Sequence, residues 1–253
     1  MATVAAHPSP CSPVATGLPG RRFDHFFFSG MALLMLVTVF VGFAPSYYLA
    51  GLFRAPLPSP IIHVHGALFS CWILLLVTQT SLVSVGRADV HRRLGMAGFI
   101  LAWVMVLVGV LAATDGLVRQ AGPPGRDVKF FYIIPLSDML IFATLIFFAF
   151  RARSNSSAHK RLILVATVAL MTAALARWPI GLIHRKAPAA ALASCIFLIM
   201  LMAYDLWSTR KIHRATAWAS AFLVFVHELR LPMGKTEAWH AFASWVQSVA
   251  TKI

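Results

Sequence analysis

The sequence predicts an all-α fold: a polytopic membrane helix bundle of about seven transmembrane helices, or six if the last one does not cross. Hydrophobic residues make up 59% of the 253 positions and charged residues 12%, whereas soluble domains have about 45–50% and about 25%. The apolar residues form runs of about 20, the length that crosses a hydrocarbon core of about 30 Å. A lipid-exposed backbone must satisfy its own hydrogen bonds, and no β-barrel alternation is present, so each run is expected to be a helix.

The expected helices cover residues 26–53, 61–85, 93–115, 130–150, 160–184, 188–207 and 215–231. Three regions follow from this pattern. Residues 1–24, which are rich in proline, form a disordered cytoplasmic tail, and residues 25–232 form the transmembrane bundle. Residues 233–253 form an amphipathic surface helix or tail, because Phe242, Trp245, Val249 and Ile253 recur at three- and four-residue steps.

The charge pattern predicts the orientation and the surroundings of the bundle. The formal net charge is +14, and most basic residues lie in short clusters between apolar runs. Counted together with the first two residues of the helix that follows each, the N-terminal tail and the loops after the second, fourth and sixth helices hold 12 Lys and Arg residues, and the other three interhelical loops hold 6. This bias predicts a cell inner membrane protein with a cytoplasmic N-terminus. Anionic lipid headgroups explain the charge, so the lipid bilayer is the expected partner and nucleic acid is not.

The histidines fall into two layers. His91, His159 and His213 stand at the cytoplasmic starts of the third, fifth and seventh expected helices, each after a preceding arginine. The outer layer consists of His63, His65, His184 and His227. Facing imidazoles in two layers suit haem b, which takes axial ligands from facing helices. The candidate cofactor-binding residues are therefore His65, His91, His159, His184, His213 and His227.

Other uses of these histidines stay open. Histidines at helix starts beside Arg and Lys also serve as interfacial anchors that contact lipid phosphate. His63 and His65 form a candidate metal pair only if the turn after Pro60 is unwound, because residues two apart on a helix point in nearly opposite directions.

Asp138 and Arg177 are predicted to form a buried ion pair. Counted from the outer helix ends, they lie at similar depths, about 12 Å and about 10 Å. Each would cost about 2.5–3.5 kcal/mol if left alone near mid-membrane. Such a pair either fixes the packing of two helices or forms an anion or proton-relay site.

Two segments carry a resemblance. His63-Val64-His65-Gly66 and the later His91-Arg92-Arg93-Leu94-Gly95, which follows Gly86-Arg87, resemble uncharacterised bacterial multi-pass membrane families with HxHG and HRxLG-type motifs. The likeness covers residues 60–185 and implies fold and location, but no activity. A fainter similarity to di-haem cytochromes b rests on the histidine layers alone. The chain departs from that pattern at Met105, where a second histidine would stand.

Three functions remain as hypotheses. The first is a haem- or metal-binding membrane redox protein that exchanges electrons with quinone. The second is a proton-coupled carrier or channel that uses Asp138, Arg177 and the outer histidines. The third is a structural or assembly subunit that associates with other membrane subunits and has no chemistry of its own. No GxSxG, P-loop, CxxC, HExxH or GxGxxG motif is present, so these classes of catalysis are not predicted.

Overall fold

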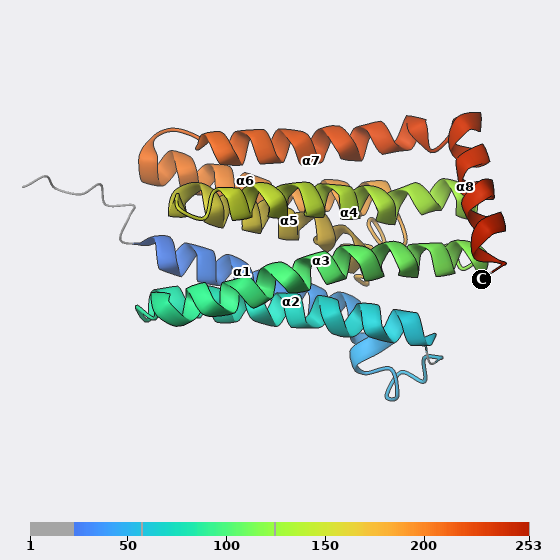
Figure 1. Ribbon diagram of the computed structural model, residues 1–253, viewed down its shortest axis with the longest axis horizontal. Coiled ribbons are helices and arrows are strands. Elements are labelled where there is room, and N and C mark those ends of the chain that lie inside the picture. Colours follow the sequence, from blue (N-terminus) through green and yellow to red (C-terminus); the bar gives the residue numbers. More distant parts are fainter. Residues whose placement is uncertain (1–22, 57, 124, 253) are drawn as a thin grey trace, which may run out of the picture.

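The computed structural model describes residues 23–56, 58–123 and 125–252, and within these ranges it is a helical bundle (Figure 1). The elements are α1 (Asp24–Phe43), a π-helical turn η2 (Ala44–Tyr48), α2 (Pro60–Ser84), α3 (Ala88–Val118), α4 (Val128–Arg151), α5 (Ser156–Leu175), α6 (Ala187–Thr209), α7 (Arg214–Met233) and α8 (Glu237–Ala250). Helices α1 to α7 run along one axis, and α8 crosses them near one end (Figure 1). The expected all-α bundle is therefore confirmed.

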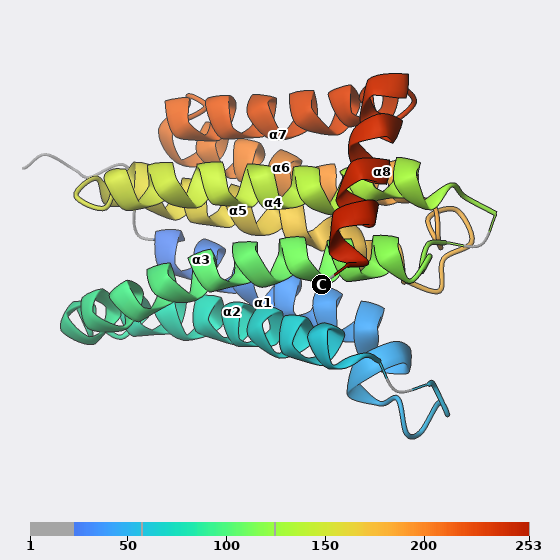
Figure 2. The same ribbon diagram turned by 45° about the vertical axis from the view of Figure 1, so that its right-hand side comes forward.

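The protein is a multi-pass membrane protein. Six of the described helices, α1 to α6, are long and apolar enough to cross a bilayer. Helix α7 falls short of this composition, because its second half carries His227, Glu228 and Arg230. It nevertheless packs along α4, α5 and α6, and both views show it parallel to the other helices (Figures 1 and 2). Helix α7 thus belongs to the bundle and does not lie across its surface.

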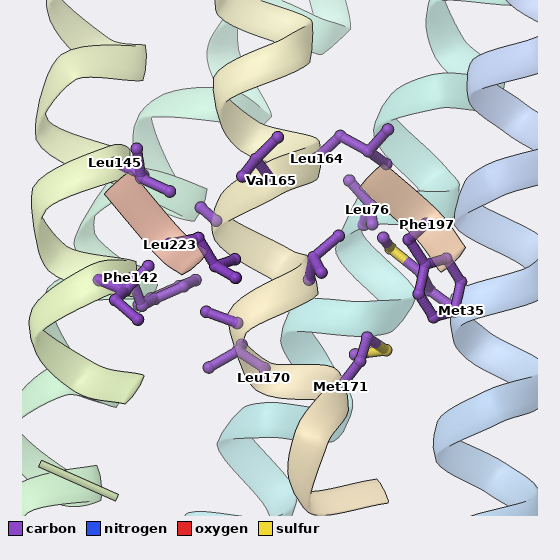
Figure 3. Close-up of a cluster of buried hydrophobic side chains, with 14 of the residues drawn as sticks. Met35, Leu76, Phe142, Leu145, Leu164, Val165, Leu170, Met171, Phe197 and Leu223 are labelled. Carbon is purple, nitrogen blue, oxygen red and sulfur yellow. The ribbon is translucent and has the colours of Figure 1, made fainter. Parts of the chain in front are cut away.

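Helix α5 forms the centre of the bundle. It contacts α1, α4, α6 and α7, and it is the most buried of the six candidate spans. Figure 3 shows its side chains Val165, Leu170 and Met171 among residues from the surrounding helices, including Met35 of α1. The backbones of α1 and α5 approach closely at Gly42, where a Cβ atom would lie only 2.3 Å from the carbonyl oxygen of Ala174. Glycine is required at that contact because any side chain would overlap the α5 backbone.

Several expected boundaries were wrong. Helix α5 ends at Leu175 and not at His184, since Pro179 follows and residues before a proline are disfavoured in helical conformation. Helix α1 ends at Phe43 and is continued by the π turn η2, which contains Pro45. At its start, α1 takes in Asp24, which was assigned to the tail. The rest of the predicted tail, residues 1–22, lies outside the described residues.

A buried ionic network ties α5, α6 and α7 together. Arg161 donates from Nε to Asp205 Oδ1 at 2.9 Å. The other carboxylate oxygen, Oδ2, accepts from the His213 backbone N–H at 3.0 Å and from Thr216 Oγ1 at 2.6 Å. Both charged side chains are almost fully enclosed, with 3% and 0% of their surface exposed. The network joins the ends of three helices. It was not predicted from the sequence.

Candidate functional site: a histidine-lined cavity

A cavity of about 450 Å³ lies between α1, α2, α3, α4 and α5. It occupies the end of the bundle at which α1, α3, α5 and α7 begin, called the cavity end below. Aromatic and aliphatic side chains form most of its wall: Phe28, Trp72, Leu75, Leu76, Phe99, Ile146, Phe150, Ile163 and Leu164. Its polar lining consists of Asp24, His25, Gln79, Thr80, Ser84, His91, Ser156, His159 and Lys160. The volume and the combination of an apolar wall with a polar section are typical of sites for small molecules and cofactors.

Two of the predicted histidines, His91 and His159, meet in this cavity. Each is the fourth residue of its helix, α3 and α5 respectively, and both helices begin at the cavity end (Figure 1). Each residue therefore lies about 4.5 Å along the axis from its helix start. The fold thus places two imidazoles at similar depth on two different walls of one space.

The hydrogen bonding of His159 fixes its tautomer. Its Nδ1 lies 2.8 Å from the backbone carbonyl oxygen of Ala149 in α4. A carbonyl can only accept, so Nδ1 carries the proton and the unprotonated nitrogen of a neutral ring is Nε2. A backbone carbonyl that binds one ring nitrogen while the other stays available is the usual support of a histidine that ligates a metal.

His91 lies in a less satisfied environment. Its buried Nδ1 has no hydrogen-bond partner in the described chain, and neither has the buried Gln79 Oε1. Gln79 holds the start of α3 by donating from Nε2 to the His91 carbonyl oxygen at 3.3 Å. Gly95, one turn after His91, also lines the cavity. Unpaired buried polar atoms are uncommon in folded proteins, so this wall of the cavity is suited to a ligand or to water.

Charged side chains form another part of the lining. Lys160 Nζ donates to Asp24 Oδ2 at 2.6 Å, and Tyr204 donates to Asp24 Oδ1 at 2.6 Å. His25 lines the cavity beside Asp24. Asp24 was missed because the tail was expected to extend to residue 24. His25 and Lys160 were not predicted as site residues either. The available signal was an acidic residue and a histidine directly before three aromatic residues, in Asp24–Phe28.

The remaining predicted histidines are not in the cavity lining. His65 packs its ring on Phe69, with 4.1 Å between the centroids, and its buried Nδ1 has no partner in the described chain. His63 is exposed, with its ring centroid 5.8 Å from that of Tyr47. Helix α2 is regular from Pro60, so the unwound turn that a metal ion between His63 and His65 would need is not present. Within the described ranges, no three His, Cys, Asp or Glu side chains gather closely enough to hold a metal ion.

His184 and His213 have local structural partners. His184 lies in the loop after α5, where its Nδ1 is 3.0 Å from the Trp178 carbonyl oxygen, and not in the helix expected over residues 160–184. His213 caps α7, since its Nδ1 accepts from the Ala215 N–H at 3.1 Å. Burial, with a smaller effect of the nearby Arg161 charge, lowers the pKa of His213 below its usual value. The neutral ring is the form that can accept this hydrogen bond.

The predicted pairing of Asp138 with Arg177 was wrong. Asp138 Oδ1 accepts from Arg230 of α7 at 2.7 Å, and His227 Nε2 lies 3.4 Å from the same oxygen. The Arg177 guanidinium stacks over the Phe43 ring at 4.5 Å and donates to the Ala173 carbonyl oxygen. The reason is again the end of α5 at Leu175, which places Arg177 in the loop. Arg230 was missed because it lies in the last turn of the helix whose crossing was uncertain.

Comparison with known proteins adds no relative. No protein-family model, no curated protein and no solved structure matches this chain.

Proposed function

We propose that the protein is a membrane redox protein that binds a haem b group in the cavity, with His91 and His159 as the imidazole ligands. The observation that supports this most directly is His159. The Ala149 carbonyl holds its Nδ1–H, so that Nε2 is available for an iron ligand bond. His91 supplies a second imidazole at similar helical depth, and it has a buried nitrogen without a partner.

The other residues of the cavity fit the same ligand. The apolar wall, with Phe28, Trp72 and Phe99, suits a flat hydrophobic macrocycle. His25 and Lys160, at the polar part of the lining, would donate hydrogen bonds to the carboxylate groups of the haem. When bound, haem supplies one-electron exchange, and a membrane quinone is the proposed electron partner.

The experiment is the absorption spectrum of the detergent-purified protein, produced in cells supplied with a haem precursor. A Soret band and one haem per chain are expected, and both are lost in His91→Ala and His159→Ala. The matched controls His63→Ala and His184→Ala keep the haem, because neither residue lines the cavity. Colourless wild-type protein, or haem retained in both cavity variants, contradicts the proposal.

A second candidate function is a proton-coupled carrier centred on Asp138. The observation that favours it is a smaller cavity of about 130 Å³, lined by His227, Glu228 and Arg230, beside the buried Asp138 carboxylate. An ionisable cluster inside a bundle commonly marks an ion or proton pathway. Substrate uptake into vesicles that is driven by a proton gradient and lost in Asp138→Asn supports this function, whereas haem loading without such uptake supports the first.

Orientation in the cell inner membrane, with the N-terminus in the cytoplasm, is part of the proposal. Exposed basic residues gather at the cavity end of the bundle: Arg87, Arg92, Arg93, Arg151, Arg153, Arg210, Lys211 and Arg214. Short loops that are rich in Lys and Arg lie on the cytoplasmic side of the membrane. A reporter fused after residue 253 should be active outside the cytoplasm if α7 crosses, and inside if it does not.

A further inference from the structure

Helix α8 is fixed to the bundle by one of its faces. Ala243, at the centre of this face, is fully buried. On either side of it, Trp239 Nε1 donates to the Lys129 carbonyl oxygen at 2.8 Å, and Gln247 Nε2 donates to the Leu117 carbonyl oxygen at 3.4 Å. In the turned view, α8 crosses in front of α3 and α4 near their ends (Figure 2).

The two flanks of α8 differ in chemistry. With Ala243 as the reference and about 100° per residue, Phe242 and Val249 lie about 100–120° to one side, and Trp245 lies beyond them. Ser244, Ser248 and Glu237 lie about 100–140° to the other side. The apolar flank is not covered by the described chain, since Phe242, Trp245 and Val249 are 42%, 61% and 42% exposed.

The level of α8 along the bundle axis explains this asymmetry. Its backbone contacts are Leu117, next to the last residue of α3, and Lys129, the second residue of α4. Helix α3 ends and α4 begins at this level, so α8 lies at the ends of two candidate spans. Further along α3, Leu107 and Leu111 are exposed.

We propose that α8 lies flat in the membrane–water interface. Its apolar flank, Phe242, Trp245 and Val249, inserts between lipid headgroups and acyl chains, and its polar flank, Glu237, Ser244 and Ser248, faces water. Amphipathic helices with aromatic residues bind lipid interfaces in this way, and tryptophan is enriched at that depth. The occupant of the apolar flank is lipid and not a second protein, because α8 lies at the ends of two candidate spans and the described chain leaves this flank uncovered. This inference does not depend on haem binding.

Nitroxide labels on single cysteines test the proposal in the full chain. The background carries serine at Cys11, Cys71 and Cys195, and the labelled positions are Phe242 and Val249 against Ser244 and Ser248. In phosphatidylcholine vesicles, collision with oxygen, which concentrates in lipid, is compared with collision with a water-soluble nickel chelate. The ratio of the two rates is expected to be several-fold higher at the first two positions.

Two results would overturn the inference. One is an equal ratio on both flanks, which places the whole helix in water. The other is a pair of strongly immobilised labels at Phe242 and Val249 with little access to either reagent, which indicates a protein partner or a second copy. A fifth label at the exposed Arg92 serves as the water-accessible reference, and size-exclusion profiles confirm that each variant is folded.

Discussion

Two buried ion pairs hold the bundle, and they differ in how completely they are satisfied. At the cavity end, Arg161 donates to Asp205 and, from Nη1, to the backbone and side-chain oxygens of Ser157. Asp205 in turn accepts from α7 as well as from α5. In the other pair, Arg230 donates from Nη1 to Asp138 and Ser137, while its buried Nε has no partner in the described chain.

The difference separates a structural network from one with spare hydrogen-bonding capacity. Around Asp205, both carboxylate oxygens and three helices are engaged, so the network fixes the relative positions of α5, α6 and α7. Around Asp138, His227 Nε2 lies 3.4 Å away without forming a hydrogen bond, and a small cavity borders Arg230. Buried ionic groups with unused donors are therefore better candidates for exchange with water, protons or ligands than fully bonded ones.

The largest effect is expected for Asp205→Ala. It leaves Arg161 buried and uncompensated, and removing one partner of a buried pair costs about 3–5 kcal/mol. The free energy of unfolding in mixed micelles measures this. The control Asp89→Ala removes a carboxylate whose side chain is 60% exposed, so its effect on the free energy of unfolding is expected to be much smaller. Equal losses for the two variants would show that the network is not structural.

For Asp138→Asn, the free energy of unfolding is expected to fall by a smaller amount, about 2 kcal/mol. The amide oxygen still accepts from Arg230, but the charge is lost. A double-mutant cycle with Arg230→Met should show coupling of at least about 0.5 kcal/mol. The parallel cycle with Arg177→Met should show none, since Arg177 contacts Phe43 and not Asp138. Coupling to Arg177 would restore the pairing expected from depth alone.

Trp72→Phe is expected to cost about 1 kcal/mol, the net value of one neutral hydrogen bond. The Trp72 indole lines the cavity, yet its Nε1 donates to Thr167 Oγ1 at 3.2 Å in the buried interface of α2 and α5. Unfolding measurements should show no comparable loss for Trp103→Phe, whose side chain is 42% exposed. If Trp72→Phe is neutral, the cavity wall at this position is less tightly fixed than its hydrogen bond indicates.

The smallest effect concerns pH and His213. The pKa of His213 is lowered in the folded protein, so the unfolded state binds more protons once the pH falls below the usual histidine pKa of about 6.5. The contribution of neutral His213 to the free energy of unfolding is therefore complete above that pH and is lost as the pH falls. His213→Asn keeps a residue that caps helices well and should flatten this part of the stability–pH curve. An unchanged slope between pH 7 and pH 5 would remove His213 as its source.

Much of the fold could be predicted from the sequence, because helix formation in lipid depends on local hydropathy. The apolar runs located the helices of the bundle, and Pro60 and the Gly/Pro loop marked breaks between them. The end of α5 was misplaced because large apolar residues, Trp178, Ile180, Leu182 and Ile183, continue past Leu175, where the helix ends. That single boundary moved Arg177 and His184 out of the helix in which they were expected.

The candidate site was predicted in part. His91 and His159 were identified from their repeated position at helix starts, and the structure adds that they share one cavity. Asp24, His25, Gln79 and Lys160 become its polar lining only when five helices assemble around it. Their chemistry is visible in the sequence, but their common location is not.

What the sequence by itself determined is the all-α architecture and the membrane environment, because the free energy of burying a 20-residue apolar segment depends on that segment alone. The tertiary structure decided which polar groups meet. Asp138 and Arg230 are 92 residues apart in the chain, and Arg161 and Asp205 are 44 apart. Such pairings follow from the rotation, length and packing order of the helices, which no single segment specifies.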